Sequence, residues 1–253
     1  NKEGDPNIRV EANIKNNELS YFDHQVTDCT FKGVFTNEYQ KNKGVSDENS
    51  AILLDDFRGK VHTIPFTTKN MMILDLKKPI ASGAFVSRFD LAQLNQTMIG
   101  KTLSFGSGKA DLRLAFKADV VNLEMQKPFL IGSIVIQNAS GTHISSKKKF
   151  NNSSVDLSFT SKELKVNQIE LNTQNSALKM KGQSDNFLNF YYDTPEKIVL
   201  NWDIHAEKID LRDFSFGSGK AASIKKSTKI TPNVINILHQ SNATINLRAE
   251  NIV

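Results

Sequence analysis

The sequence predicts an all-β fold, mainly antiparallel, with a few short helices. Apolar and polar residues alternate along much of the chain, as is typical of strands with one buried face. The connections between the alternating blocks are short, which favours antiparallel neighbours over parallel strands joined by crossover helices. The heptapeptide SFGSGKA also occurs twice, at 104–110 and 215–221. Such internal repeats are expected of an architecture assembled from one unit used several times.

The alternating blocks define the expected strands. In ADLRLAFKADVV (110–121) apolar residues stand at every second position, with Asp, Arg and Lys at most of the positions between them. The same pattern predicts strands around 8–14, 155–159, 178–180, 198–206 and 243–249. His205 lies between Ile204 and Ala206, so we expect its side chain to face solvent.

Turns and short helices are expected between these strands. Polar clusters predict turns at 16–17, 44, 138–141, 151–154 and 173–176. Short helices are predicted within DLAQLNQTMI (90–99), DNFLNFYY (185–192) and PNVINILHQ (232–240). Asp90 and Asp210 each follow an apolar residue and precede Leu. We expect both to cap the short segments that begin there.

The two copies of SFGSGKA, each preceded by this apolar-Asp-Leu pattern, divide the chain. We expect one domain over 1–253, with repeat units of roughly 1–100, 101–214 and 215–253, the last one incomplete. Because the chain begins with Asn1 and not with Met, we also expect it to be cut from a longer protein.

The composition argues against several classes of function. The net charge is +5, but lysines alternate with acids and aromatic residues are not interleaved with bases, so nucleic-acid binding is not expected. Cys29 is the only cysteine and the five histidines are scattered, so we expect neither a disulfide nor a metal site. The basic run at 147–149 is either a solvated turn or a site of attraction to anionic lipid headgroups.

No enzyme motif is present, so we expect a non-enzymatic protein without a cofactor. SFGSGKA is no phosphate loop, because Gly106 and Gly108 are one residue apart and Ala110 replaces the magnesium-binding hydroxyl. A glycosidase uses two carboxylates, and acidic pairs stand at Asp55-Asp56 and at Asp210 with Asp213. A carbohydrate-active β-protein therefore remains one alternative.

Several stretches resemble a known family. FLIGSIVIQNASG (129–141) and the segment from FNNSSVDLSF to DNFLNFY (150–191) resemble the carboxy-terminal portion of AsmA-like envelope proteins of the Bacteroidota type. SRFDLAQLNQTMIGKTLSFGSGKADLRLAF (87–116) is similar to the linker and strand that recur in this family, and the segment 233–253 is similar to the start of another unit.

The resemblance implies an elongated, curved antiparallel sheet that is open along one side as an apolar groove. Family members are anchored by an amino-terminal membrane helix and project into the periplasm. There they are implicated in outer-membrane homeostasis and in conducting phospholipids between membranes. SFGSGKA would mark the same turn-into-strand junction in two successive units, where glycines ease the bend.

Transferred to this chain, the groove would be lined by the apolar-face residues of the predicted strands. These are Leu112, Leu114, Phe116, Ile134, Ile136, Val155, Leu157, Phe159, Leu178, Met180, Leu200, Trp202 and Ile204.

The leading hypothesis is thus a periplasmic module that binds or conducts phospholipid or another acyl-chain lipid. In the full-length protein it would be anchored to the inner membrane through a segment outside this sequence. The alternative from another class is a structural or adhesive β-repeat scaffold whose apolar face packs into a closed core.

Overall fold

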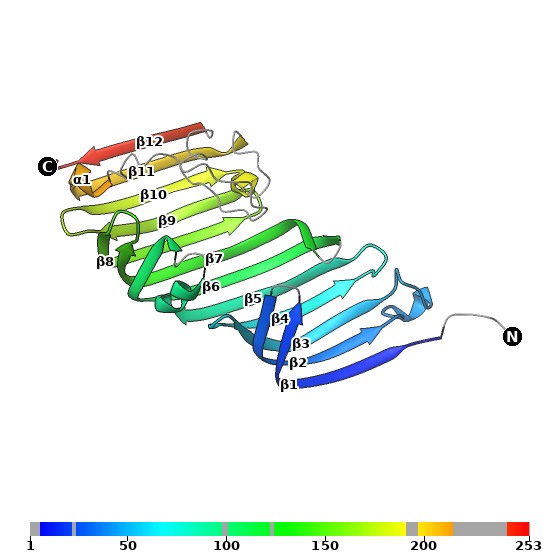
Figure 1. Cartoon of the computed structure of the whole chain (residues 1–253). Coiled ribbons are helices and arrows are strands. Elements are labelled where there is room, and N and C mark those ends of the chain that lie inside the picture. The colour runs from blue at the N-terminus through cyan, green and yellow to red at the C-terminus, as the bar shows by residue number, and fades with distance from the viewer. Residues whose placement is uncertain are drawn as a thin grey trace, which may run out of the picture. The chain divides into compact units, whose positions relative to one another are not determined.

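The all-β prediction is confirmed. The computed structural model describes residues 6–21, 24–97, 101–121, 124–190, 197–214 and 242–252. These residues form a sheet of twelve strands whose spatial order is the order of the chain (Figure 1). The strands are β1 (Arg9–Tyr21), β2 (His24–Thr36), β3 (Ala51–Val61), β4 (Ile64–Leu74), β5 (Ile80–Asp90), β6 (Leu103–Val121), β7 (Glu124–His143), β8 (Lys148–Thr160), β9 (Glu163–Asn172), β10 (Ala177–Asp185), β11 (Val199–Lys208) and β12 (Asn242–Ala249).

Antiparallel pairing dominates, as the short connections predict. It joins β1 through β5 in succession and β8 through β11 in succession. The exception is β12, which runs parallel to β11. A parallel neighbour needs a long connection, and the segment 215–241 provides the length for one.

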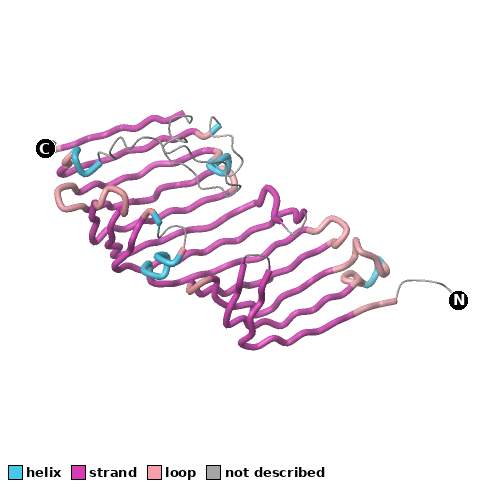
Figure 2. The backbone as a smooth tube through the Cα atoms, in the orientation of Figure 1, coloured by secondary structure: helices cyan, strands magenta, loops and turns pink. Residues whose placement is uncertain are grey.

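The described helices are short (Figure 2). They are η1 (Lys41–Lys43), η2 (Leu91–Gln96), η4 (Phe187–Phe190) and α1 (Leu211–Phe214). Thus η2 and η4 confirm two of the predicted helices as short 3-10 turns, while the prediction at 232–240 lies outside the described residues. Asp90 forms a reciprocal capping box with Gln93 at the start of η2, as expected of a cap.

The chain divides into two compact units. Unit 1 comprises Asn1–Phe89 and Asp111–Gly132, and unit 2 comprises Asp90–Ala110 and Ser133–Val253. The strands β6 and β7 therefore each contribute one part to unit 1 and the other part to unit 2.

Three of the predicted turns are wrong, because their residues lie inside long strands. The clusters at 16–17, 138–141 and 151–154 belong to β1, β7 and β8. Asn16, Asn138 and Asn152 have φ values of 47°, 53° and 40°. Asn tolerates this left-handed conformation, so the strand continues through it. At Asn16 the pairing with β2 also shifts register, as at a β-bulge. The cluster at 173–176 does form the turn between β9 and β10, and Gly44 follows η1.

Residues in the left-handed conformation also occur within neighbouring strands of unit 1. Asp28, Asp56 and Asn70, in β2, β3 and β4, also have positive φ. The pairing of β1 with β2 and of β2 with β3 shifts register near these positions. In Figure 1 the end of β1 and the start of β2 turn sharply away from the rest of the two strands.

A row of phenylalanines crosses unit 1. Phe31, Phe57, Phe66 and Phe85 come from the consecutive strands β2 to β5, and their ring centroids are separated by 5.6, 5.1 and 5.6 Å. Pairs in this range contribute about 0.5 to 1.5 kcal/mol each beyond the area they bury. The row therefore ties four strands together on one face.

The first copy of SFGSGKA starts at the second residue of β6, shortly after the turn at Thr102, as predicted for a turn-into-strand junction. Gly108 has a φ of 119°, and a Cβ at this position would lie 2.7 Å from Leu91 Cδ1 and 2.8 Å from Ala139 Cα. Leu91, the first residue of η2, is completely buried. Gly108 thus provides the space in which η2 is anchored. The second copy, at 215–221, lies outside the described residues.

We expect Gly108→Ala to destabilise unit 2 by about 2 to 4 kcal/mol, because it adds both backbone strain and a clash. The matched control is Gly106→Ala, since a Cβ at Gly106 would have Ser140 O as its nearest neighbour, at 3.8 Å. Urea unfolding of the two variants tests this. Equal losses of stability would show that Gly108 is not the restricted position.

Candidate functional site

The thirteen predicted groove residues lie on five strands: β6, β7, β8, β10 and β11. Leu178 and Leu200 are buried, at 6% exposure each, and the other eleven are half-buried. Those on β6 (Leu112, Leu114 and Phe116) belong to unit 1, and the other ten belong to unit 2. The structure therefore distributes the predicted site over two units.

In unit 2 the strand register brings seven of the predicted residues together in three rows. Residues directly opposite one another in neighbouring strands project from the same face. One row reads Val155, Ile169, Met180, Ile204 and Leu247 across β8 to β12, a second reads Leu157, Val166, Gly182, Trp202 and Ile245, and a third reads Phe159, Leu164, Ser184, Leu200 and Ala243. We call this surface the apolar face of β8–β12.

The strand β9 also belongs to this face, although strict alternation does not predict it. Leu164 and Val166 are followed by Ile169 and Leu171, so the apolar positions shift from even to odd numbers within one strand. The pairing with β10 shifts register at this point. Apolar and polar residues alternate within each half of β9, but the apolar positions change from even to odd between the halves. Strict alternation over the whole segment is therefore absent.

The apolar face is packed at one end and accessible at one edge. At the packed end, Leu178, Ala206 and Ile209 form a buried cluster that Leu171 and Ala249 also contact. At the edge strand β12, Ile245 and Leu247 are 54% and 52% exposed. The three rows of the face contain no charged residue. All strands of the described residues belong to one sheet, so among them no second sheet covers this face.

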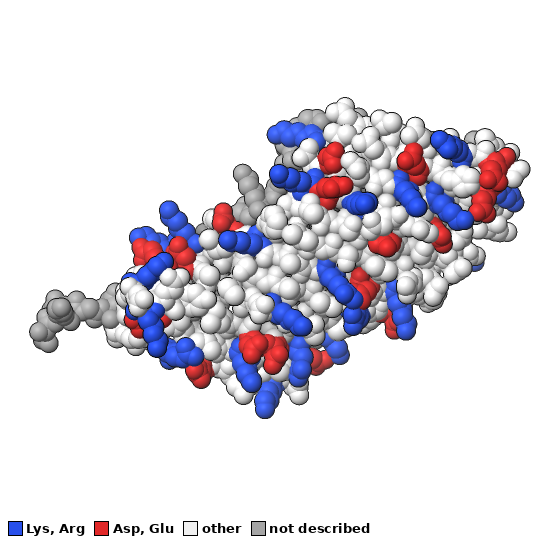
Figure 3. Space-filling view, turned by 180° about the vertical axis from the view of Figure 1, so that it is seen from behind, with Lys and Arg blue, Asp and Glu red and all other residues white. Residues whose placement is uncertain are grey.

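The opposite face of the same strands is polar. Glu170, Lys179, His205 and Arg248 form one of its rows, and Lys179 makes an ion pair of 2.9 Å with Glu207. His205 is exposed, as predicted. A hollow of about 530 Å³ lies among these side chains. In Figure 3 basic and acidic side chains are interspersed, without a large region of one sign.

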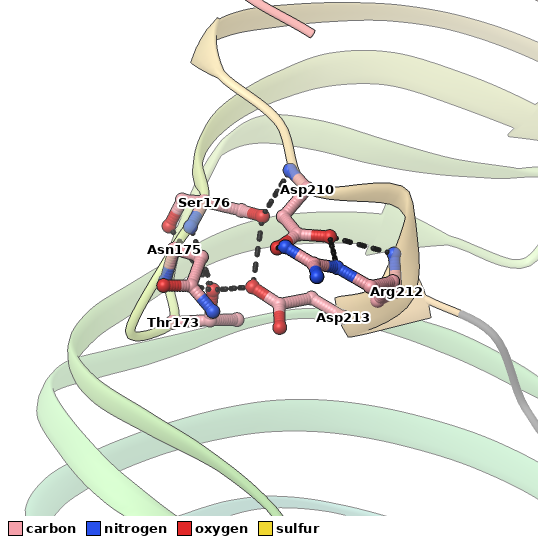
Figure 4. A network of polar contacts seen from close by, with 6 residues as sticks. All are labelled: Thr173, Asn175, Ser176, Asp210, Arg212 and Asp213. Atoms are coloured by element: carbon pink, nitrogen blue, oxygen red, sulfur yellow. Dashed lines mark hydrogen bonds and ion pairs between the residues drawn. The ribbon is translucent and has the colours of Figure 1, made fainter. Parts of the chain in front are cut away.

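A polar network secures the packed end of the face (Figure 4). Asp210, just after β11, accepts hydrogen bonds from the Arg212 backbone N at 2.9 Å and from Arg212 Nη2 at 2.6 Å. This confirms Asp210 as the cap of α1. Ser176, in the turn before β10, accepts a bond from the Asp210 backbone N and donates one to Asp213, both at 2.9 Å. Thr173 also donates to Asp213.

The network accounts for the acidity of both carboxyl groups. Hydrogen bonds from Arg212 lower the pKa of Asp210 from its ordinary value of 3.8 to about 2, although desolvation opposes the shift. Desolvation also acts to raise the pKa of Asp213, but the hydrogen bonds from Thr173, Ser176 and Asn175 outweigh it, so this pKa is lowered as well. Both groups are ionised at neutral pH and engaged in structural contacts. A glycosidase needs one carboxyl group that holds a proton, and this pair does not offer it.

Other chemistry is sparse in the described part of the chain. It contains no group of three or more His, Cys, Asp or Glu side chains arranged to hold a metal ion. None of its helices is long and apolar enough to span a membrane.

Comparison of the chain with protein-family models, with curated proteins and with solved structures gave no match. The resemblance to AsmA-like proteins therefore stays a prediction.

We expect acid to loosen the packed end selectively. Because Asp210 has a lowered pKa in the folded state, its contribution to stability is complete above its unfolded pKa of 3.8 and is lost as the pH falls towards 2. Amide hydrogen exchange of β10 and β11 between pH 5 and pH 2 measures this loss. In Asp210→Asn this part of the acid dependence should disappear.

Arg212→Gln serves as the matched partner, and it should remove the same part of the acid dependence as Asp210→Asn. The double variant should lose no more than either single one. An unchanged profile in Asp210→Asn would contradict this role of the network.

Proposed function

We propose that the chain binds lipid through the apolar face of β8–β12, and that it holds or conducts acyl chains without catalysing a reaction. One observation carries the proposal: three uncharged rows cross five strands in register and remain accessible at β12. Contiguous apolar surface of this kind marks sites of contact with other molecules.

The dimensions of the face suit a chain-like ligand. Five strands spaced about 4.8 Å apart give each row a length of about 19 Å. A ligand lying along a row would contact one side chain from each strand in turn. Because the rows are parallel and similar in character, an acyl chain can move along or between them without crossing a charged position. This supports conduction as well as storage.

The side chains of the face favour a flexible apolar ligand. Met180 and Trp202 lie next to each other in adjacent rows of β10 and β11. The thioether of Met adapts to irregular surfaces, and a Trp ring offers a large apolar area with one polar edge. Such linings are typical of sites that accept hydrocarbon chains.

The cellular setting that we propose rests on the resemblance to AsmA-like proteins. In that setting the chain is a periplasmic module held at the inner membrane by a segment outside this sequence, and its lipid is destined for the outer membrane. The polar face of β8–β12, with charges of both signs, suits an aqueous compartment on the other side of the sheet.

Lipid analysis of the purified protein tests the proposal as a whole. We expect native mass spectrometry of protein prepared without detergent from a bacterial periplasm to show bound phospholipid. Protein mass alone would contradict lipid binding and would favour a scaffold whose apolar face packs against another protein surface.

A charge placed on the face should abolish lipid binding without unfolding the sheet. We choose Ile245→Asp, because Ile245 is 54% exposed and the new carboxylate stays hydrated in the free protein. Contact with an acyl chain would desolvate that carboxylate, so we expect bound lipid to fall by about tenfold or more. The amount of lipid per protein, measured by extraction and mass spectrometry, gives the result.

The matched control is Thr244→Asp, which adds the same charge at the adjacent, exposed position on the polar face. It should retain the bound lipid. Equal lipid contents in the two variants would place the binding surface elsewhere.

A further inference from the structure

Two polar atoms on the apolar face of β8–β12 have no hydrogen-bond partner. They are Ser184 Oγ and Trp202 Nε1, and both are closed off from solvent. Ser184 as a whole is only 2% exposed. A buried donor without a partner costs stability, and such groups are rare enough in native proteins to require a reason.

The two groups are neighbours on the same face. Trp202 of β11 lies opposite Gly182 of β10, and Ser184 follows two residues later, opposite Leu200. Diagonal neighbours of this kind are about 7 to 8 Å apart between their Cα atoms, which is within reach of an aromatic side chain. One small group placed between the two side chains would therefore be close to both.

Gly182 brings the indole close to β10. A Cβ at Gly182 would lie 2.9 Å from Trp202 Cδ1, the ring carbon bonded to Nε1. The edge of the ring that carries the N–H thus lies beside the strand that carries Ser184. A larger residue at 182 would displace this edge.

The chemistry of the pair specifies its ligand. The indole N–H can only donate, and the serine hydroxyl can donate as well as accept, so a single acceptor can satisfy both groups. A carbonyl oxygen has two lone pairs and can accept both bonds. The neighbouring residues in the rows, such as Leu164, Val166 and Leu200, are apolar, and no row residue carries a positive charge. A carboxylate would be buried there without a counter-charge, which favours a neutral carbonyl.

We propose that Ser184 and Trp202 form a subsite for the ester carbonyl oxygen of an acyl lipid. The inference rests on the proposed lipid-binding function and adds the part of the lipid that is recognised. The acyl chain continues along the apolar rows, while the ester group is held at β10 and β11.

The experiment compares two soluble lipids that differ only at the carbonyl. Dihexanoyl phosphatidylcholine has ester carbonyls, and its dihexyl ether analogue lacks them. Calorimetry measures both affinities, and the emission of Trp202, the only tryptophan of the chain, reports contact at the subsite. We expect the ester to bind about tenfold more tightly than the ether and to change the emission.

Ser184→Ala tests the hydroxyl. It should reduce the preference for the ester to about threefold and leave the melting temperature of the lipid-free protein unchanged or raised, because an unsatisfied group is removed. The matched control is Ser87→Ala. Ser87 is also 2% exposed, but it donates to Pro65 O at 2.6 Å. Its loss should lower the melting temperature by about 2 to 4 °C.

The outcomes separate the two proposals. Equal affinities for ester and ether, or ester binding without a change in Trp202 emission, would overturn the subsite and leave lipid binding intact. If neither lipid binds, the proposed function fails and the subsite with it. A fall in melting temperature in Ser184→Ala equal to that in Ser87→Ala would show that the hydroxyl already has a partner, and would also overturn the subsite.

Discussion

A β-sheet of one layer has two faces, and in β8–β12 only one of them is polar. The charged rows on the polar face are hydrated, whereas the opposite rows consist of Leu, Ile, Val, Phe, Met, Trp and Ala, with Gly182 and Ser184 between them. The hydrophobic effect requires that such a face be covered. The described residues cover its end near Ile209 but leave Ile245 and Leu247 at β12 more than half exposed. The remaining features of unit 2 follow from this requirement.

Bulges and small residues adapt the strands to one another within each unit. Asn or Asp in the left-handed conformation does not end a strand, so β7 and β8 continue past Asn138 and Asn152. Gly108 leaves space for Leu91, and Gly182 leaves space for Trp202. The Asp210–Arg212 pair and Ser176 then fix the chain where β11 ends. Local backbone conformation thus determines how neighbouring side chains pack within each unit.

The sequence predicted the class of fold and one face of unit 2, because strict alternation reports which side of a strand is buried. It failed where the phase changes inside a strand. The Asn-rich clusters of β1, β7 and β8 indicated turns, since Asn favours the same left-handed backbone in turns and in bulges. The strand β9 was missed for a similar reason. The unpaired atoms of Ser184 and Trp202 depend on cross-strand register, which a single sequence does not display.

The most direct test of lipid binding on the apolar face of β8–β12 is photo-crosslinking with a phospholipid that carries a diazirine in its acyl chain. Mass spectrometry then locates the labelled residues. Lipid binding on this face predicts adducts on Met180, Ile204 and Ile245, which share it. Labelling confined to the polar face, at residues such as Lys181 and Asp203, would contradict it.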